Sequence, residues 1–127
     1  MPPSTETHQH TVLAFYDALI NQKNFDLARS FIGPRYIQHN PLWEDGFAGL
    51  QALAAMLKTD FPAARSEIKR VFTDGDHVIL HVHSLRAPGS PGRAIVDIFR
   101  MEDGLIAEHW DVIQEVPRTS ANTNGMF

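Results

Sequence analysis

Two aspartates and a histidine near the end of the chain form the strongest candidate for chemistry. Asp97 lies in "AIVDIFRM", and His109 and Asp111 lie in "AEHWDVIQEV". Asp is depleted in strands, so carboxylates inside apolar strands need a reason. Burial and a neighbouring carboxylate both raise the pKa of an Asp, which could then take a proton from carbon next to a carbonyl. A nearby His could donate to the carbonyl oxygen.

Whether these side chains share a face depends on the turn between the two strands. A two-residue Asp103-Gly104 loop would pair Asp97 with Trp110, whereas a three-residue loop over 102–104 with a β-bulge would pair Asp97 with His109. A Gly after two turn-forming residues favours the longer loop, with Gly104 in the left-handed region. This register puts Asp97, His109 and Asp111 on one otherwise apolar face and turns Trp110 outward. An Asp–His pair that merely satisfies a buried position explains the pattern equally well.

Other histidines are weaker candidates. His39 in "YIQHNP" lies in a short extended segment that could reach over a sheet, although a lone His beside Asn-Pro is more often a surface residue. In "HVILHVHS", His77, His81 and His83 alternate with apolar residues. Imidazole binds metals, but a strand with one buried and one polar face is the simpler interpretation, and we expect no metal site.

Composition excludes several classes of function. The 127 residues are 43% hydrophobic and 20% charged, which is typical of one globular domain. A net charge of −4 argues against nucleic acid as a partner. Without cysteine the chain has no disulfide or thiolate site. The N-terminal residues lack the pattern of a secretory signal, and no apolar run reaches the roughly 20 residues of a membrane span, so we expect a cytoplasmic protein without membrane contact.

The elements that must position these residues divide into helices first and strands second. Helical spacing predicts a helix over 5–22, a shorter one capped by Asn24 and ended by Gly33-Pro34, and a third over 46–60 stopped by Pro62. Asp-Gly pairs between apolar runs predict two hairpins, over 66–85 and 93–116. This order indicates a single α+β domain with helices on one face of an antiparallel sheet. We expect residues 1–5 and 118–127 to fray.

The segments "YIQHNP", "GLQALAAML", "FTDGDHVILHVH" and "VDIFRMEDGLIAEHWDVIQEVP" together carry a resemblance. In their order and spacing the chain resembles the SnoaL-like polyketide cyclase family of the NTF2-like superfamily. The resemblance implies a cone-shaped, curved antiparallel sheet enclosing a cavity closed by N-terminal helices, and a homodimer through the outer sheet face. It also implies a pocket Asp that acts as general acid/base in an intramolecular aldol closure, without metal or cofactor. The polar residues that match are His39, Asp97, His109 and Asp111.

These observations favour a cofactor-independent acid/base enzyme acting on a small to medium apolar carbonyl compound, by aldol cyclisation or isomerisation. Asp97 or Asp111 would remove the proton, and His39 or His109 would polarise the carbonyl or return the proton. We expect substrate contacts from Phe15, Tyr36, Trp43, Phe61, His83 and Phe99.

Two alternatives remain open. The same pocket could hold a small apolar ligand in a non-catalytic binding or dimerisation module. Water addition, as in epoxide hydrolysis, would need an Arg in the pocket, and Arg100 falls on the opposite face in the favoured register.

Overall fold

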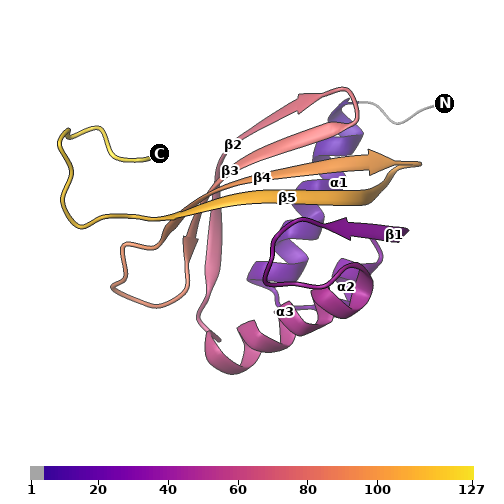
Figure 1. Ribbon diagram of the computed structural model, residues 1–127, viewed down its shortest axis with the longest axis horizontal. Coiled ribbons are helices and arrows are strands. Elements are labelled where there is room, and N and C mark those ends of the chain that lie inside the picture. Colours follow the sequence, from indigo (N-terminus) through magenta and orange to yellow (C-terminus); the bar gives the residue numbers. More distant parts are fainter. Residues whose placement is uncertain (1–4) are drawn as a thin grey trace.

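The computed structural model describes residues 5–127 as three α-helices and a five-stranded sheet (Figure 1). The helices are α1 (Thr5–Tyr16), which continues into a π-helical turn (Asp17–Asn21), α2 (Phe25–Arg29) and α3 (Gly46–Asp60). The strands are β1 (Ile32–Gln38), β2 (Arg65–Asp74), β3 (His77–Leu85), β4 (Arg93–Glu102) and β5 (Leu105–Glu115). No helix within the described residues is long and apolar enough to cross a membrane.

The sheet is mixed. Its strand order is β1-β5-β4-β3-β2, and the two predicted hairpins form its four antiparallel strands. The expectation of a purely antiparallel sheet was wrong, because β1 pairs in parallel with β5. Parallel strands need a long connection, and here α3 and the two hairpins supply it. The α+β class is confirmed.

The helices cover one face of the sheet, as Figure 1 shows, and the core lies between them. On β3, Val78, Leu80 and Val82 are fully buried. Phe99 on β4 packs edge-on against Phe15 of α1, with ring centroids 5.9 Å apart. The opposite, outer face is partly exposed, and the predicted homodimer through it stays a prediction.

The turn between β4 and β5 differs from the one favoured by the sequence. It has two residues, Asp103 and Gly104, both with positive φ (53° and 78°), and Glu102 pairs with Leu105. The predicted β-bulge is present, because Met101 pairs with Ile106 whereas Arg100 pairs with Glu108, which leaves Ala107 as the extra residue.

The bulge has two consequences for the site. The predicted pairing of Asp97 with His109 was wrong, since Asp97 lies opposite Asp111 and His109 lies opposite Phe99. The predicted face was nevertheless correct. One inserted residue switches every later side chain to the other face, so the bulge returns His109 and Asp111 to the face of Asp97.

Two boundaries also differ from the predictions. The first helix changes to a π-turn at Asp17, and its last hydrogen bond runs from Gln22 N to the Asp17 carbonyl at 2.9 Å. Gly33-Pro34 does not end α2, which stops at Arg29, but lies inside β1. Pro is tolerated there because β1 is an edge strand. The Asn24 cap is confirmed by its side chain, which accepts from Leu27 N at 3.0 Å.

The structure describes the C-terminal end of the chain but not the first four residues. Residues 1–4 of the expected fraying N-terminus lie outside the described residues. Residues 118–127 contain no helix or strand, yet the last residue, Phe127, stacks on His83 with ring centroids 4.3 Å apart. The C-terminal segment thus returns to the outer face of the sheet.

Candidate functional site

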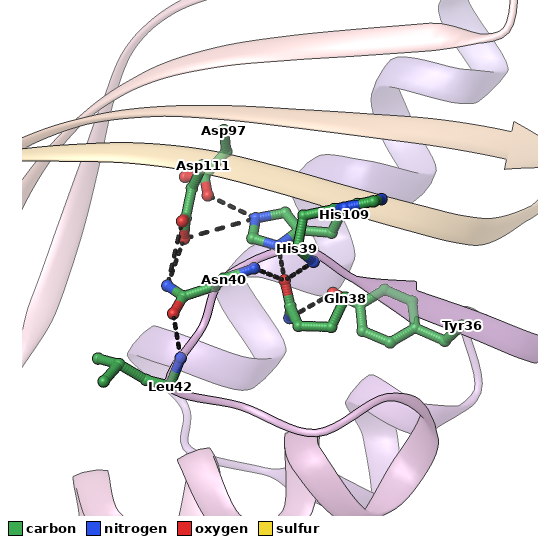
Figure 2. Close-up of polar contacts among 8 residues, drawn as sticks. All are labelled: Tyr36, Gln38, His39, Asn40, Leu42, Asp97, His109 and Asp111. Carbon is green, nitrogen blue, oxygen red and sulfur yellow. Dashed lines mark hydrogen bonds and ion pairs between the residues drawn. The ribbon is translucent and has the colours of Figure 1, made fainter.

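A cavity of about 90 Å³ lies between the inner face of the sheet and the helices. Its wall is mainly apolar, with Phe15, Leu19, Ile20, Leu50, Leu53, Leu57, Ile95, Phe99 and Ile113 among its residues. The polar residues of the wall lie in groups. We call one group the carboxylate end (Figure 2), and it consists of Gln38, Asn40, Asp97, His109 and Asp111.

At the carboxylate end, His109 is bonded to Asp97. Its Nε2 lies 2.7 Å from Asp97 Oδ1 and 3.9 Å from Asp111 Oδ2. The side chains of His109 and Asp97 are only 9% and 4% exposed, so this pair is shielded from water. Asp97 Oδ2 is also buried, and it has no hydrogen-bond partner within residues 5–127. A buried carboxylate oxygen without a donor is costly, and such groups call for an explanation.

Gln38 determines where the protons of His109 lie. Its Oε1 accepts the backbone N–H groups of His39 (3.1 Å) and Asn40 (3.0 Å), which identifies this atom as the oxygen. His109 Nδ1 lies 2.7 Å from the same oxygen and must therefore donate to it. Nε2 is left to share a single proton with Asp97, as an imidazolium–carboxylate pair or as its neutral counterpart.

Asn40 holds Asp111 in a similar way, as Figure 2 shows. Its Nδ2 donates to both carboxylate oxygens of Asp111 at 3.0 Å, while its Oδ1 accepts the backbone N–H of Leu42 at 2.9 Å. The Leu42 contact fixes the amide so that its donor side faces the carboxylate. Asp111 is thus oriented by a neutral amide, whereas Asp97 is bonded to an imidazole.

The loop that carries Asn40 is itself tied down. Asp45 Oδ1 accepts the backbone N–H of Gln38 at 2.7 Å and closes the loop on itself. Gly49 in α3 packs so tightly against the Glu44 carbonyl that a Cβ atom would overlap it. Any larger residue at position 49 would push the loop away, so a glycine in α3 helps to set the position of the Asn40 amide.

Two tyrosines complete this end of the cavity. Tyr16 and Tyr36 are 7% and 4% exposed, and both line the wall. Burial is the main cause that holds the pKa of each phenol well above its usual value, and the charges of Asp97 and Asp111 raise it further. The Tyr16 hydroxyl also interacts directly with the Asp97 carboxylate, which raises the pKa of Tyr16 in addition. Both hydroxyls therefore stay protonated at neutral pH. The Tyr36 oxygen already accepts from Gln38 Nε2 at 3.3 Å, which leaves its proton available to a ligand.

Asp97, His109 and Asp111 are also residue types that bind divalent cations, with possible ligand atoms within 4.8 Å of one another. Here both imidazole nitrogens are engaged by Gln38 and Asp97. At 2.7 Å, His109 Nε2 and Asp97 Oδ1 are joined by a hydrogen bond, and an ion held by both atoms at about 2.0–2.2 Å would force them apart. In this arrangement His109 and Asp97 form a hydrogen-bonded pair, and Asp111 lies 3.9 Å from the imidazole.

The structure brings most of the predicted site residues together. Asp97, His109 and Asp111 meet at the carboxylate end, and the cavity wall includes Phe15, Tyr36, Trp43 and Phe99. Three predicted residues lie elsewhere. His39 stacks on Trp110 (4.8 Å between centroids) and bonds to Glu108 at 2.7 Å. His83 stacks on Phe127, and Phe61 lies beneath the guanidinium of Arg86.

Gln38 and Asn40 were missed by the sequence analysis, although a signal for them existed. Residues alternate sides in an extended segment, so Tyr36, Gln38 and Asn40 share one side of "YIQHN", and His39 points to the other. His39 was predicted because of its chemical type. Its position three residues after Tyr36 places it on the side that faces away from the cavity. Arg100 lies opposite the cavity as predicted, pairing with Glu108 at 2.9 Å, but Arg65, Arg86 and Arg93 line the wall and were not foreseen.

Solved structures with the same fold support the architecture. TsrD from Streptomyces laurentii is 23% identical, with a TM-score of 0.73 over 87% of this chain and 90% of its own. A "Putative SnoaL-like polyketide cyclase" from Jannaschia sp. CCS1 is 23% identical, with a TM-score of 0.71 and 89% of each chain covered. An uncharacterized cystatin fold protein from Novosphingobium aromaticivorans is also 23% identical, with a TM-score of 0.70 over 83% of this chain and 97% of its own. At these identities the likeness shows the fold.

The family of the chain follows from its match to a family of domains. No curated protein is similar enough to count as a relative. The SnoaL-like domain matches residues 12–109, from α1 to the histidine of the carboxylate end. The cone-like α+β fold and the cavity between the sheet and the helices agree with it. The chain therefore belongs to the SnoaL-like domain family, within the NTF2-like fold.

Proposed function

We propose that the protein is a cofactor-independent acid/base enzyme that forms an enolate from a small carbonyl compound. Asp111 takes a proton from the carbon next to the carbonyl, and the electron pair of the broken C–H bond moves onto the carbonyl oxygen. The enolate then attacks a second carbonyl in an aldol cyclisation, or is reprotonated at another carbon in an isomerisation. Both reactions share this first step.

The placement of Asp111 is the observation that carries the proposal. Its side chain is 12% exposed, against 4% for Asp97, and it lines the cavity. A neutral amide orients Asp111, which leaves it able to act as a base toward a ligand. Asp97 instead shares a proton with His109 and is a positioning residue, because their joint proton sets the charge beside Asp111. This assigns the base to one of the two predicted candidates.

The phenols of Tyr16 and Tyr36 are the donors for the developing oxyanion. Asp111 contributes to the raised pKa of both groups through its negative charge. When Asp111 takes the substrate proton that charge disappears, and negative charge near the phenols becomes less costly. The donors thus become more favourable as the enolate forms, which is what catalysis by differential binding requires. They take the role that the sequence analysis gave to His39 or His109.

The size and polarity of the cavity limit the substrate. Typical ligand pockets measure about 300–1,000 Å³, whereas this one measures about 90 Å³ and has a mainly apolar wall. These values favour a small carbonyl compound with an apolar body. A larger substrate would need the loop over 39–45 or α3 to move outward.

Proton exchange in deuterium oxide tests the proposal without knowledge of the natural substrate. Small ketones are incubated with the protein, and loss of the α-proton signal is followed by ¹H NMR. Wild type should catalyse exchange, and Asp111→Asn should lower the rate by about 10²-fold or more, since a general base contributes about 10²–10⁴-fold. Asp60→Asn, at the exposed end of α3, is the matched control and should exchange as wild type.

The comparison with Asp97→Asn decides the assignment. If Asp111→Asn keeps full activity and Asp97→Asn loses it, Asp97 is the base. If wild type exchanges no ketone of the series yet binds them, the protein is a ligand-binding module and the catalytic proposal is wrong. Circular dichroism of each variant separates loss of activity from loss of the fold.

A further inference from the structure

The cavity has a second polar region, made of three arginines, which we call the arginine end. It comprises Arg65 at the start of β2, Arg86 just after β3 and Arg93 at the start of β4. In an antiparallel meander these three positions lie at the same end of three neighbouring strands. Arg65 lies opposite Leu85, and Arg93 lies opposite Ser84. The chain carries a net charge of −4, so three cations on one cavity wall run against its overall balance.

Arg93 lacks the partner that a buried guanidinium normally has. Its Nε is buried and has no hydrogen-bond partner within residues 5–127. None of the ion pairs formed in this part of the chain involves Arg93 or Arg86. An unpaired buried donor costs free energy unless something satisfies it. The cavity is the place from which a ligand could do so.

The surrounding charges leave the arginine end positive. Burial, together with the nearby charge of Arg93, lowers the pKa of Arg86. Glu115 acts in the opposite direction on Arg86, but it is exposed to water. Arg65 is 60% exposed and already pairs with Glu67 at 2.8 Å. Two guanidiniums therefore face one solvated carboxylate, and a bound anion would relieve their repulsion.

The two ends of the cavity lie on one strand. Arg93 and Asp97 are four residues apart on β4 and face the same way, which separates their Cα atoms by about 13 Å. Ile95 lies between them, and Ile113 is opposite Ile95 on β5. A ligand that spans the cavity would thus meet an arginine pair, an apolar stretch and then the carboxylate end.

We propose that the arginine end, with Arg93 and Arg86, binds a carboxylate on the substrate and that the substrate is an oxo acid. Guanidinium matches a carboxylate through two parallel hydrogen bonds, which fixes orientation as well as affinity. The carboxylate would anchor one end and place the carbonyl near Asp111 and the phenols. The inference deepens the proposed function, since it names the other end of the same substrate.

Binding of matched ligand pairs tests this subsite separately from catalysis. The probes are 4-oxopentanoate, 5-oxohexanoate and 6-oxoheptanoate, each with its primary amide, and Kd is measured by calorimetry at fixed ionic strength. At least one acid should bind about 10-fold or more tighter than its amide, since a hydrogen bond to a charged group contributes about 1.5–3 kcal/mol. Arg93→Gln should remove this preference. Arg118→Gln, in the exposed C-terminal segment, makes the same charge change away from the cavity and should keep it.

The outcomes separate the two proposals. If the acids bind no tighter than the amides, or if Arg93→Gln and Arg86→Gln both keep the preference, the anion subsite is wrong. If the acids bind through Arg93 but wild type exchanges none of their α-protons, the subsite stands and the catalytic proposal fails. If Asp111-dependent exchange occurs equally on acids and amides, the catalytic proposal stands and the anion subsite is wrong. Should Arg93→Gln fail to fold, Arg86→Gln, which alters a half-buried loop residue, decides alone.

Discussion

The two faces of the β4–β5 hairpin use similar residues for different purposes. On the inner face His109 is 9% exposed and bonded to Asp97, while on the outer face His39 is 42% exposed and bonded to Glu108; both distances are 2.7 Å. Water screens the outer pair, and similar exposed pairs contribute about 0–1 kcal/mol. The inner pair is shielded, so removing one partner leaves a buried charge or an unsatisfied donor. The two hydrogen bonds thus have the same length but contribute different free energies, because the His109 pair is buried and the His39 pair is not.

A single residue decides which side chains reach the inner face. Ala107 is the extra residue of the bulge. If it paired with Arg100 instead, every later residue of β5 would lie on the other side of the sheet. Before the bulge Ile106 points inward, and after it His109 and Asp111 do. Four experiments test the difference between the two faces.

Inserting one alanine between Glu108 and His109 should have the largest effect. The insertion would place Trp110 opposite Asp97 and turn His109 and Asp111 toward water, so we expect destabilisation beyond about 4 kcal/mol, or loss of cooperative folding. Urea unfolding followed by circular dichroism measures the loss. Insertion of one alanine after Thr119, in the exposed C-terminal segment, should have little effect. A native-like transition in the first insertion variant would show that a second bulge absorbs the added residue.

Replacing the two histidines compares the faces directly. His109→Ala should cost about 3–5 kcal/mol of unfolding free energy, because Asp97 then remains buried without its partner. His39→Ala should cost about 1 kcal/mol or less. Both values come from urea midpoints at pH 7. Equal losses in the two variants would contradict the assigned difference in burial.

Asn40→Ala removes the amide that orients Asp111. We expect a loss of about 1–3 kcal/mol, since a carboxylate that is only 12% exposed loses both of its hydrogen bonds to Asn40, and a lower rate of α-proton exchange. Asn24→Ala is the matched control. It removes a helix cap worth about 1 kcal/mol but lies away from the cavity wall, so exchange should be unchanged once the protein is folded. Equal exchange rates in both variants would argue against a role for Asp111.

The smallest expected effect is a pH dependence on the outer face. His39 and then Arg100 lower the pKa of Glu108. A carboxyl whose pKa is lowered by folding contributes stability above its unfolded pKa of about 4.3, and this is lost as the pH falls through the lower folded value. Glu108→Gln should therefore flatten the stability curve below about pH 4.5, by no more than about 1 kcal/mol. Thermal unfolding between pH 3 and 7 measures the difference, and an unchanged slope would contradict it.

Sequence patterns predicted most of the fold because the relevant signals are local. The bounds of α3, the Asn24 cap and both hairpins follow from apolar spacing, side-chain capping and Asp-Gly turns, each readable within a few residues. The parallel pairing of β1 with β5 joins segments about 70 residues apart, and nothing local announces it. Gly33-Pro34 was interpreted as a helix end because an edge strand, where Pro is tolerated, cannot be recognised without its neighbours.

The candidate site also combines features that follow from local sequence with features that depend on distant segments. That two carboxylates and an imidazole would share a face of the last hairpin could be predicted from the residues alone, because strand alternation and chemical type are local properties. A bulge was expected as well, but the tertiary structure showed that it follows a two-residue turn and that Asp97 lies opposite Asp111. It also decided that Gln38 and Asn40, from a distant segment, set the protons and orientation of the carboxylate end, and that three arginines gather opposite. Hydrogen-bond partners and burial depend on which surfaces meet in space, and these in turn determine the energy of every charge in the cavity.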